Sequence, residues 1–217
     1  MRGIFISFEG SDGGGKTTQI SRLAERLGEA GLRVRTTREP GGTAAGEQIR
    51  NLLQSAREGE RLHPEAELLL FAASRAQLVR EVIEPALAAG ECVLADRFLD
   101  STTVYQGVAR RLRREDVAAI NNFAVGNTRP DITFVFDLCP TVARERLTAR
   151  SGTERDRIEA QPQAFFEAVR AGYLELARQE PERVRVIDAS QPVEAVHQSI
   201  WAILEEKFHG ILARASV

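Results

Sequence analysis

The sequence predicts a single α/β domain of three layers, in which helices cover both faces of a parallel five-stranded sheet. Short apolar segments alternate with longer segments of helical periodicity along all 217 residues, with no internal repeat or linker. The short segments are apolar throughout, as strands are when both faces of a sheet are covered. The length suits one large domain with a sizeable core.

The first half of the chain begins with a buried strand at 3–8. A glycine-rich turn leads into an amphipathic helix at 17–30, whose apolar residues recur at helical spacing. Gly31 is a favourable residue to end this helix. A short strand is expected at 33–37. After a second glycine loop, the pattern predicts a helix at 44–56.

The middle of the chain is expected to be mostly helical. A proline opens the long helix predicted at 64–88, at a position where its missing N–H costs little. Gly90 ends this helix, and the sequence ECVLA at 91–95 predicts the third strand. Helical patterns follow at 101–106 and 114–125.

The last third returns to alternating elements. The segment ITFVFD at 132–137 predicts the fourth strand, followed by a helix at 141–149. The stretch at 150–159 is too polar to be core. The remaining elements are a helix at 162–178, a strand at 184–187 and a helix at 192–208.

Composition and charge exclude several classes of protein. With 43% hydrophobic and 28% charged residues, the chain is not disordered throughout, collagen-like or a coiled coil. A net charge of −2 argues against a protein that chiefly holds nucleic acid. No apolar run approaches the ~18 residues of a membrane span, and Glu9 interrupts the first apolar segment too early for a signal peptide. We expect neither nucleic acid nor a membrane as a partner.

The two cysteines favour a reducing compartment. Cys92 and Cys139 lie in apolar segments, without the paired spacing of a disulfide framework or a zinc site. We therefore expect a cytoplasmic protein.

A phosphate-binding loop follows the first strand. Residues 10–17 spell GSDGGGKT, which matches the P-loop pattern G-x-x-x-x-G-K-[ST] between a strand and a helix. The glycines let backbone N–H groups face one anion, and the helix N-terminus adds the positive end of its dipole. Lys16 would reach the β- and γ-phosphates, and the Thr17 hydroxyl would bind Mg²⁺. Lys16 is one of only two lysines among 29 basic residues, and a compact charge suits this position.

The loop alone leaves several functions open. A signalling GTPase would carry an Asn-Lys-x-Asp element, which this sequence lacks. A P-loop ATPase that drives an interaction with a protein partner stays open as an alternative. A small-molecule kinase needs a second anion pocket and a cationic cover, and the sequence offers candidates for both.

The candidates for the second pocket are polar and aromatic residues near strand ends. Asp96 and Arg97 end the third strand, where parallel sheets bind ligands. Asp96 can join Thr17 at a metal, and Arg97 can hold a phosphate. Phe71 and Arg75 are four residues apart and share a helix face. This pair suits a stacked base with a hydrogen-bonded carbonyl, although a core phenylalanine and a solvated arginine would have the same spacing.

The candidate cover is the polar stretch at 149–159. Arg150, Arg155 and Arg157 surround Gly152 between two predicted helices, just after the fourth strand. A lid there would exclude water and bring cations to a transferring phosphoryl group. A solvated loop is the competing interpretation.

In their order along the chain, these features resemble the bacterial thymidylate kinases over almost the whole length. The matching segments are 8–18, 37–43, Phe71 with Arg75, 96–107, 129–131 and 156–159. REPGG in the second segment and YQG in the fourth are much more specific than the phosphate loop. The resemblance implies a P-loop nucleoside monophosphate kinase fold with a short lid. It also implies transfer of the γ-phosphoryl group of ATP to dTMP with Mg²⁺.

The resemblance further implies which residues take part. Those implied to bind ATP are Gly10, Ser11, Asp12, Gly13, Gly14, Gly15, Lys16, Thr17 and Thr18. Those implied to bind dTMP are Glu39, Arg50, Phe71, Arg75, Arg97, Thr102, Tyr105 and Gln106, with Arg38 as a weaker candidate. Those implied to act in catalysis are Asp12, Lys16, Arg97, Arg150, Arg155 and Arg157.

Individual contacts follow from the same resemblance. Phe71 would stack on thymine, Arg75 would bond its carbonyl edge, and Arg97 would hold the dTMP phosphate. Tyr105 would crowd the 2′ position and so favour deoxyribose. Thr102 departs from the serine or asparagine that is more usual at its position.

Two further expectations rest on the resemblance. Some thymidylate kinases place an arginine inside the phosphate loop, whereas this chain has Gly13 and Gly14 there. The lid arginines are therefore implied to supply the cations. Similar enzymes are homodimers that pack through the long helix, which here includes residues 68–70, so we expect a homodimer.

Overall fold

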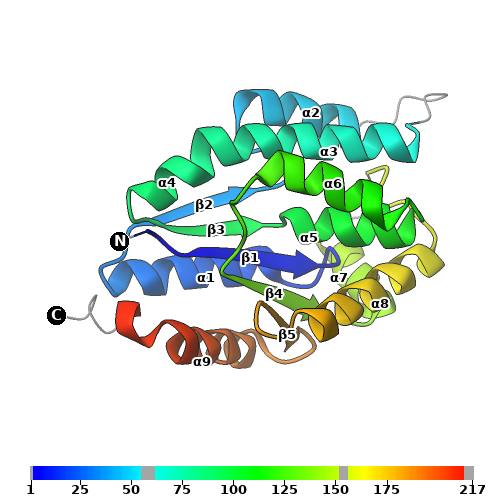
Figure 1. Cartoon of the computed structure of the whole chain (residues 1–217). Coiled ribbons are helices and arrows are strands. Elements are labelled where there is room, and N and C mark those ends of the chain that lie inside the picture. Colours follow the sequence, from blue (N-terminus) through cyan, green and yellow to red (C-terminus); the bar gives the residue numbers. More distant parts are fainter. Residues whose placement is uncertain (1, 55–61, 152–155, 213–217) are drawn as a thin grey trace.

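The computed structural model describes residues 2–54, 62–151 and 156–212 (Figure 1). Five parallel strands form one sheet in the order β2-β3-β1-β4-β5. The strands are β1 (Phe5–Gly10), β2 (Val34–Arg38), β3 (Cys92–Asp96), β4 (Ile132–Asp137) and β5 (Val184–Asp188). The predicted parallel five-stranded α/β fold is confirmed.

Nine α-helices and two π-helical segments are present in this described part of the chain. The α-helices are α1 (Lys16–Glu29), α2 (Ala44–Gln54), α3 (Pro64–Leu78), α4 (Glu84–Ala88), α5 (Leu99–Thr102), α6 (Arg114–Val125), α7 (Pro140–Ser151), α8 (Gln163–Gln179) and α9 (Val193–Leu212). The π-helical segments are η1 (Val79–Ile83), between α3 and α4, and η2 (Thr103–Ala109), directly after α5.

The π-helical segments correct two of the predicted helices. The helix predicted at 64–88 is interrupted by η1, and the one predicted at 101–106 is part of a longer segment formed by α5 and η2. Apolar periodicity does not distinguish one wide turn from the α-helical turns around it. π-Helical turns are frequent at functional sites, and η2 carries two of the predicted site residues.

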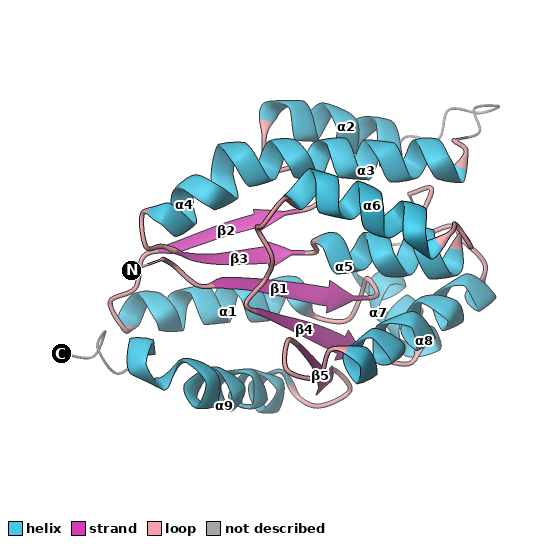
Figure 2. Cartoon of the chain, viewed as in Figure 1, coloured by secondary structure: helices cyan, strands magenta, loops and turns pink. Residues whose placement is uncertain are grey.

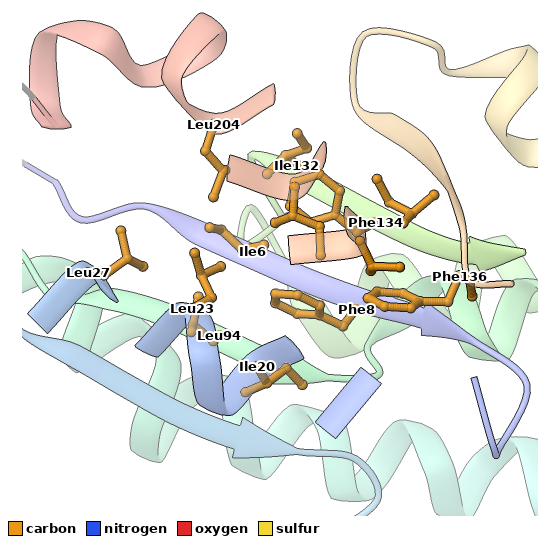
Figure 3. Close-up of a cluster of buried hydrophobic side chains, with 14 of the residues drawn as sticks. Ile6, Phe8, Ile20, Leu23, Leu27, Leu94, Ile132, Phe134, Phe136 and Leu204 are labelled. Carbon is orange, nitrogen blue, oxygen red and sulfur yellow. The ribbon is translucent and has the colours of Figure 1, made fainter. Parts of the chain in front are cut away.

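Alternation along β1 divides its side chains between two cores. Ile6 and Phe8 point to one face, where they pack with Leu23 of α1 and with side chains of α9 (Figure 3). Phe5 points to the opposite face and packs in a cluster with Val79 of η1. Each fully buried side chain of this size contributes roughly 1.5–3 kcal/mol. The sheet is therefore held from both faces.

Helices cover both faces of the sheet and leave its carboxyl edge at one end. α1 and α9 cover one face, while α3, α6 and α8 lie over the other (Figures 1 and 2). All five strands run in the same direction, so their carboxyl ends meet at one edge.

Of the described helices, none is long and apolar enough to cross a membrane.

Candidate active site

β1 leads directly into the phosphate loop. Gly13 and Gly15 adopt φ angles of 82° and 89°, which favour glycine, and a Cβ on Gly13 would lie 2.3 Å from the carbonyl oxygen of Ala143 in α7. Gly15 is also the N-cap of α1 and offers no side chain to the free N–H groups of the first turn. These N–H groups and the helix dipole are available to an anion.

Three charged side chains meet beside this loop. Lys16 is 5% exposed, and its Nζ donates to the carbonyl oxygens of Gly10 and Ser11 at 3.2 and 3.0 Å. Asp12 Oδ1 lies 3.5 Å from that Nζ and accepts from Nη2 of Arg97 at 2.9 Å. Although burial alone would raise it, the charges of Arg97 and Lys16 lower the pKa of Asp12 below its ordinary value. An ionised Asp12 therefore joins the two cations.

Arg97 is held in an uncommon backbone conformation. Its φ is 71°, and its N–H donates to the carbonyl oxygen of Phe8 at 2.9 Å. Its Nη1 donates to Ser101 Oγ at 3.2 Å, and the guanidinium carbon lies 5.2 Å from the ring centre of Tyr105. Non-glycine residues with positive φ are uncommon and concentrate at functional sites. The turn after β3 thus aims one arginine at the loop.

Two oxygen-bearing side chains meet at the end of the loop. The Thr17 hydroxyl donates to Asp96 Oδ2 at 2.8 Å. Across the described residues there is no group of three or more His, Cys, Asp or Glu side chains that could hold a metal by itself. Mg²⁺ is usually bound by one or two protein oxygens, phosphates and waters. The oxygen donor set of Thr17 and Asp96 fits Mg²⁺ bound in that way.

A cavity of about 300 Å³ adjoins Asp12 and Arg97. The predicted residues that line it are Asp12, Thr17, Glu39, Arg50, Phe71, Asp96, Arg97, Thr102, Tyr105 and Gln106. Its other walls include Arg38 and residues 156, 158 and 159, which belong to the last part of the predicted lid. Side chains from both halves of the sequence therefore form one pocket at the carboxyl edge of the sheet.

Arg75 lies beneath this cavity and does not line it. The side chain is fully buried, and its Nε and Nη2 donate to both carboxylate oxygens of Glu39, the shortest contact being 2.6 Å. Nη2 also donates to Thr102 Oγ1 at 2.9 Å, and Nη1 to Asn121 Oδ1 at 2.8 Å. Burial raises the pKa of Glu39 to about 7, in spite of the guanidinium beside it. Arg75 thereby fixes two side chains of the cavity wall, Glu39 and Thr102.

The predicted lid arginines are only partly covered by the structure. Arg155 lies outside the described residues. Arg150 belongs to the last turn of α7, and its side chain also lies outside the described part of the chain. Arg157 donates from Nε to the carbonyl oxygen of Leu53 at 3.0 Å and forms a 2.6 Å ion pair with Glu67. In this conformation Arg157 joins the end of the predicted lid to α2 and α3.

Glu9 is a buried carboxylate that the sequence analysis gave no role. It accepts hydrogen bonds from the Phe98 N–H at 2.8 Å, from Ser101 Oγ at 2.6 Å and from the Tyr173 hydroxyl of α8 at 2.7 Å. These bonds fix the turn that carries Arg97. Burial, followed by the charge of Asp100, raises the pKa of Glu9. A single acidic residue within an apolar strand is a signal that could have identified it.

Glu67 is a second buried acid without an assigned role. Its carboxylate accepts from Gln106 Nε2 at 2.7 Å and from Arg110 at 3.2 Å. Glu67, Phe71 and Arg75 are spaced four residues apart and therefore share one face of α3. Extending that spacing by one turn from Phe71 would have identified Glu67 in the sequence.

This arrangement can bring two anions together. One anion site is formed by the loop, Lys16 and the N-terminus of α1, and the other by Arg97 above the cavity. Asp12 contacts the cations of both sites, so the two sites adjoin. Direct transfer of a phosphoryl group between two bound phosphates is the chemistry that such adjoining sites favour.

Comparison with known proteins points to one family. A sequence model of the thymidylate kinase family matches residues 8–200. The thymidylate kinase of Pseudomonas putida (strain W619) is 49% identical over 211 residues, which cover 97% of this chain and 99% of that protein. The thymidylate kinase of Symbiobacterium thermophilum is 51% identical over 204 residues, covering 94% and 93%. The crystal structure of thymidylate kinase from Ehrlichia chaffeensis has a TM-score of 0.76 at 33% identity, covering 94% of this chain and 100% of that one.

The buried Glu39–Arg75 pair should dominate local stability. Arg75→Met is expected to lower the free energy of unfolding by about 3–5 kcal/mol, because it leaves a buried carboxylate without its cation. Arg38→Met is the matched control, since the Arg38–Glu47 pair is 53% and 40% exposed and such pairs contribute at most about 1 kcal/mol. Urea unfolding of both variants at neutral pH measures the difference. Equal losses would contradict this assignment.

Proposed function

The chain belongs to the thymidylate kinase family and phosphorylates dTMP to dTDP with ATP as the donor, and we propose that one edge of its sheet carries this reaction in two adjoining halves. The observation that carries the proposal is Asp12, which contacts both Lys16 and Arg97. The loop side takes the triphosphate and the Arg97 side takes the monophosphate. The whole chain acts as one kinase domain, with a lid at about 149–159.

The donor half consists of residues 10–18 and Mg²⁺. Backbone N–H groups of the loop and the ammonium of Lys16 hold the β- and γ-phosphates. Burial and the nearby Arg97 lower the pKa of Lys16, while Asp12 and Asp96 favour its charged form. Thr17 and Asp96 would hold the Mg²⁺, which when bound neutralises charge on the phosphates.

The acceptor half is the cavity under Arg97. Phe71 stacks on the base, Arg97 holds the phosphate, and Arg50 lies nearby with its Nη1 bonded to the Pro40 carbonyl oxygen at 3.0 Å. Tyr105 occupies the sugar side; burial raises its pKa to about 12, so its hydroxyl stays protonated and uncharged.

The remaining acceptor contacts are assigned to the walls of the same cavity. Thr102 and Gln106 contact the base, and Glu39 lies toward the sugar and the metal. Arg75, which does not line the cavity, acts on the base through Glu39 and Thr102, the two wall residues that it holds.

The chemical step depends on positioning the two phosphates and does not require a general base. The attacking group is a phosphate oxygen of dTMP, and the second pKa of a phosphate ester is about 6, so this oxygen is mostly deprotonated at neutral pH. Asp12 therefore positions the two cations and does not abstract a proton. Lid arginines 150, 155 and 157 supply charge to the transferring group when the lid closes. For Arg157 this requires release from Glu67.

A P-loop ATPase that drives a protein partner is the less supported alternative. Such an enzyme has no need of a cavity beside the loop that contains an arginine and an aromatic wall. The cavity at Arg97 favours the nucleotide acceptor.

The proposed division of labour predicts two different kinetic defects. Lys16→Met should lower kcat by about 100-fold or more, with little change in dTMP affinity, because its charge acts on the donor phosphates. Arg97→Ala should mainly raise the KM for dTMP, by about 10- to 100-fold, because a charged hydrogen bond is lost. Lys207→Met removes the only other lysine, which lies on α9, and should leave both constants unchanged.

Initial-rate kinetics over a matrix of ATP and dTMP concentrations separate these effects. A Lys16→Met variant with normal kcat would refute the donor half. An Arg97→Ala variant with normal dTMP binding would remove Arg97 from the acceptor half.

The proposed assembly is a cytoplasmic homodimer. The large apolar side chains Leu52 of α2, Leu69 of α3 and Phe123 of α6 are 54%, 56% and 88% exposed. α3 packs against both α2 and α6, so the three helices form one continuous surface (Figure 1). Large apolar side chains exposed on adjoining helices are typical of protein–protein contacts.

Light scattering at micromolar concentration tests the dimer. The wild-type chain should have twice the 24.0 kDa chain mass. Leu69→Glu should shift the mass toward the monomer, because it places a charge in the contact. Val193→Glu is the control, at a 49% exposed position on α9. A monomeric wild-type chain would contradict the proposal.

A further inference from the structure

Gln106 lies between a buried acid and the acceptor cavity. Its side chain is 2% exposed and lines the cavity together with Phe71 and Thr102. Its Nε2 donates to Glu67 Oε1 at 2.7 Å. Among the described residues, none donates to its other terminal atom, Oε1. The amide therefore has one fixed end and one end available to a ligand.

The Glu67 carboxylate determines which end of the Gln106 side-chain amide faces it. Besides Gln106, the Glu67 carboxylate receives Arg110 at 3.2 Å and Arg157 at 2.6 Å. Although burial alone would raise it, these hydrogen bonds and charges lower the pKa of Glu67. An ionised carboxylate can only accept hydrogen bonds. The NH2 group of Gln106 must therefore face Glu67, and its oxygen must face away.

We infer that Glu67 is a specificity-determining residue, which acts by holding Gln106 with its carbonyl oxygen presented to the base. A base with an N3–H, such as thymine or uracil, donates to that oxygen. Cytosine instead carries a lone pair at N3, which would face the lone pairs of Gln106. A buried polar group left without a partner is costly, so the site rejects cytosine. The inference rests on the proposed acceptor half, and adds Glu67 as the residue that orients Gln106 within it.

Glu67→Gln tests this directly. The neutral amide can either donate or accept, so it no longer determines the orientation of Gln106. The ratio of kcat/KM for dTMP to that for dCMP should fall about tenfold or more, the effect of one hydrogen bond. The ratio of dTMP to dUMP should change less than about twofold, because both bases carry the same N3–H. A general loss of structure, or a change at Arg157, would lower all three rates together and leave both ratios unchanged.

Arg110→Lys is the matched control. It keeps a positive charge beside Glu67 but removes the planar fork that donates to it. Glu67 then stays ionised and still orients Gln106. Both nucleotide ratios should stay within about twofold of wild type. An altered dTMP/dCMP ratio in this variant alone would assign the selectivity to Arg110 and overturn the inference.

A measurement on the wild-type chain keeps the test decisive if Glu67→Gln does not fold. The side-chain NH2 signals of Gln106, assigned by their loss in Gln106→Leu, should exchange with solvent at least about tenfold more slowly than exposed side-chain amides. They should stay protected when dTMP is added. Rapid exchange would show that Glu67 does not hold the amide, and would overturn the inference.

Failure of the inference and failure of the proposed function are distinguishable. If wild type prefers dTMP and a folded Glu67→Gln variant keeps the same dTMP/dCMP ratio, Glu67 is only structural and the acceptor assignment of Arg97 is unaffected. If Arg97→Ala leaves dTMP binding normal, the acceptor half itself is wrong, and the orientation of Gln106 toward a base fails with it.

Discussion

The site depends on the requirement that every charge removed from water be paired. Three glutamates, Glu9, Glu39 and Glu67, are 0%, 4% and 2% exposed, and an unpaired buried carboxylate would cost several kcal/mol. Each meets its donors close to the cavity at the carboxyl edge of the sheet: Glu9 under the turn of Arg97, Glu39 against Arg75, and Glu67 against Gln106. The buried acids therefore determine the orientation of the groups that the nucleotide would touch.

This arrangement addresses the main obstacle to phosphoryl transfer between nucleotides, which is the repulsion between two polyanions. Arg97 and Lys16 are both cations, and Asp12 between them offsets their repulsion when no phosphate is bound. Bound phosphates would then compete with Asp12 for the two cations. Preorganised charge of this kind lowers the barrier without reorganisation at the moment of reaction. No side chain is needed as a general base, because the attacking phosphate oxygen is already mostly deprotonated at neutral pH.

Much of the fold and part of the site could be predicted from the sequence, because these depend on local patterns. The uniformly apolar strands, the loop around Lys16 and the Asp96–Arg97 strand end are each encoded in a few consecutive residues. Glu9 and Glu67 escaped prediction because their partners lie 89 and 39 residues away in Phe98 and Gln106, so only the folded chain brings them together. The π-helical turns were missed because a single wide turn leaves the apolar periodicity almost unchanged.

The central claim is that phosphoryl transfer occurs directly between two nucleotides at one edge of the sheet. The most direct test measures initial rates of ADP formation from Mg-ATP with dTMP, dUMP, dCMP, dGMP, dAMP or UMP, and without an acceptor. The account predicts rapid ADP formation with dTMP, a slower rate with dUMP, one dTDP formed for each ADP, and only background without acceptor. Comparable ADP release without any acceptor would contradict it, because the site would then transfer the phosphoryl group to water.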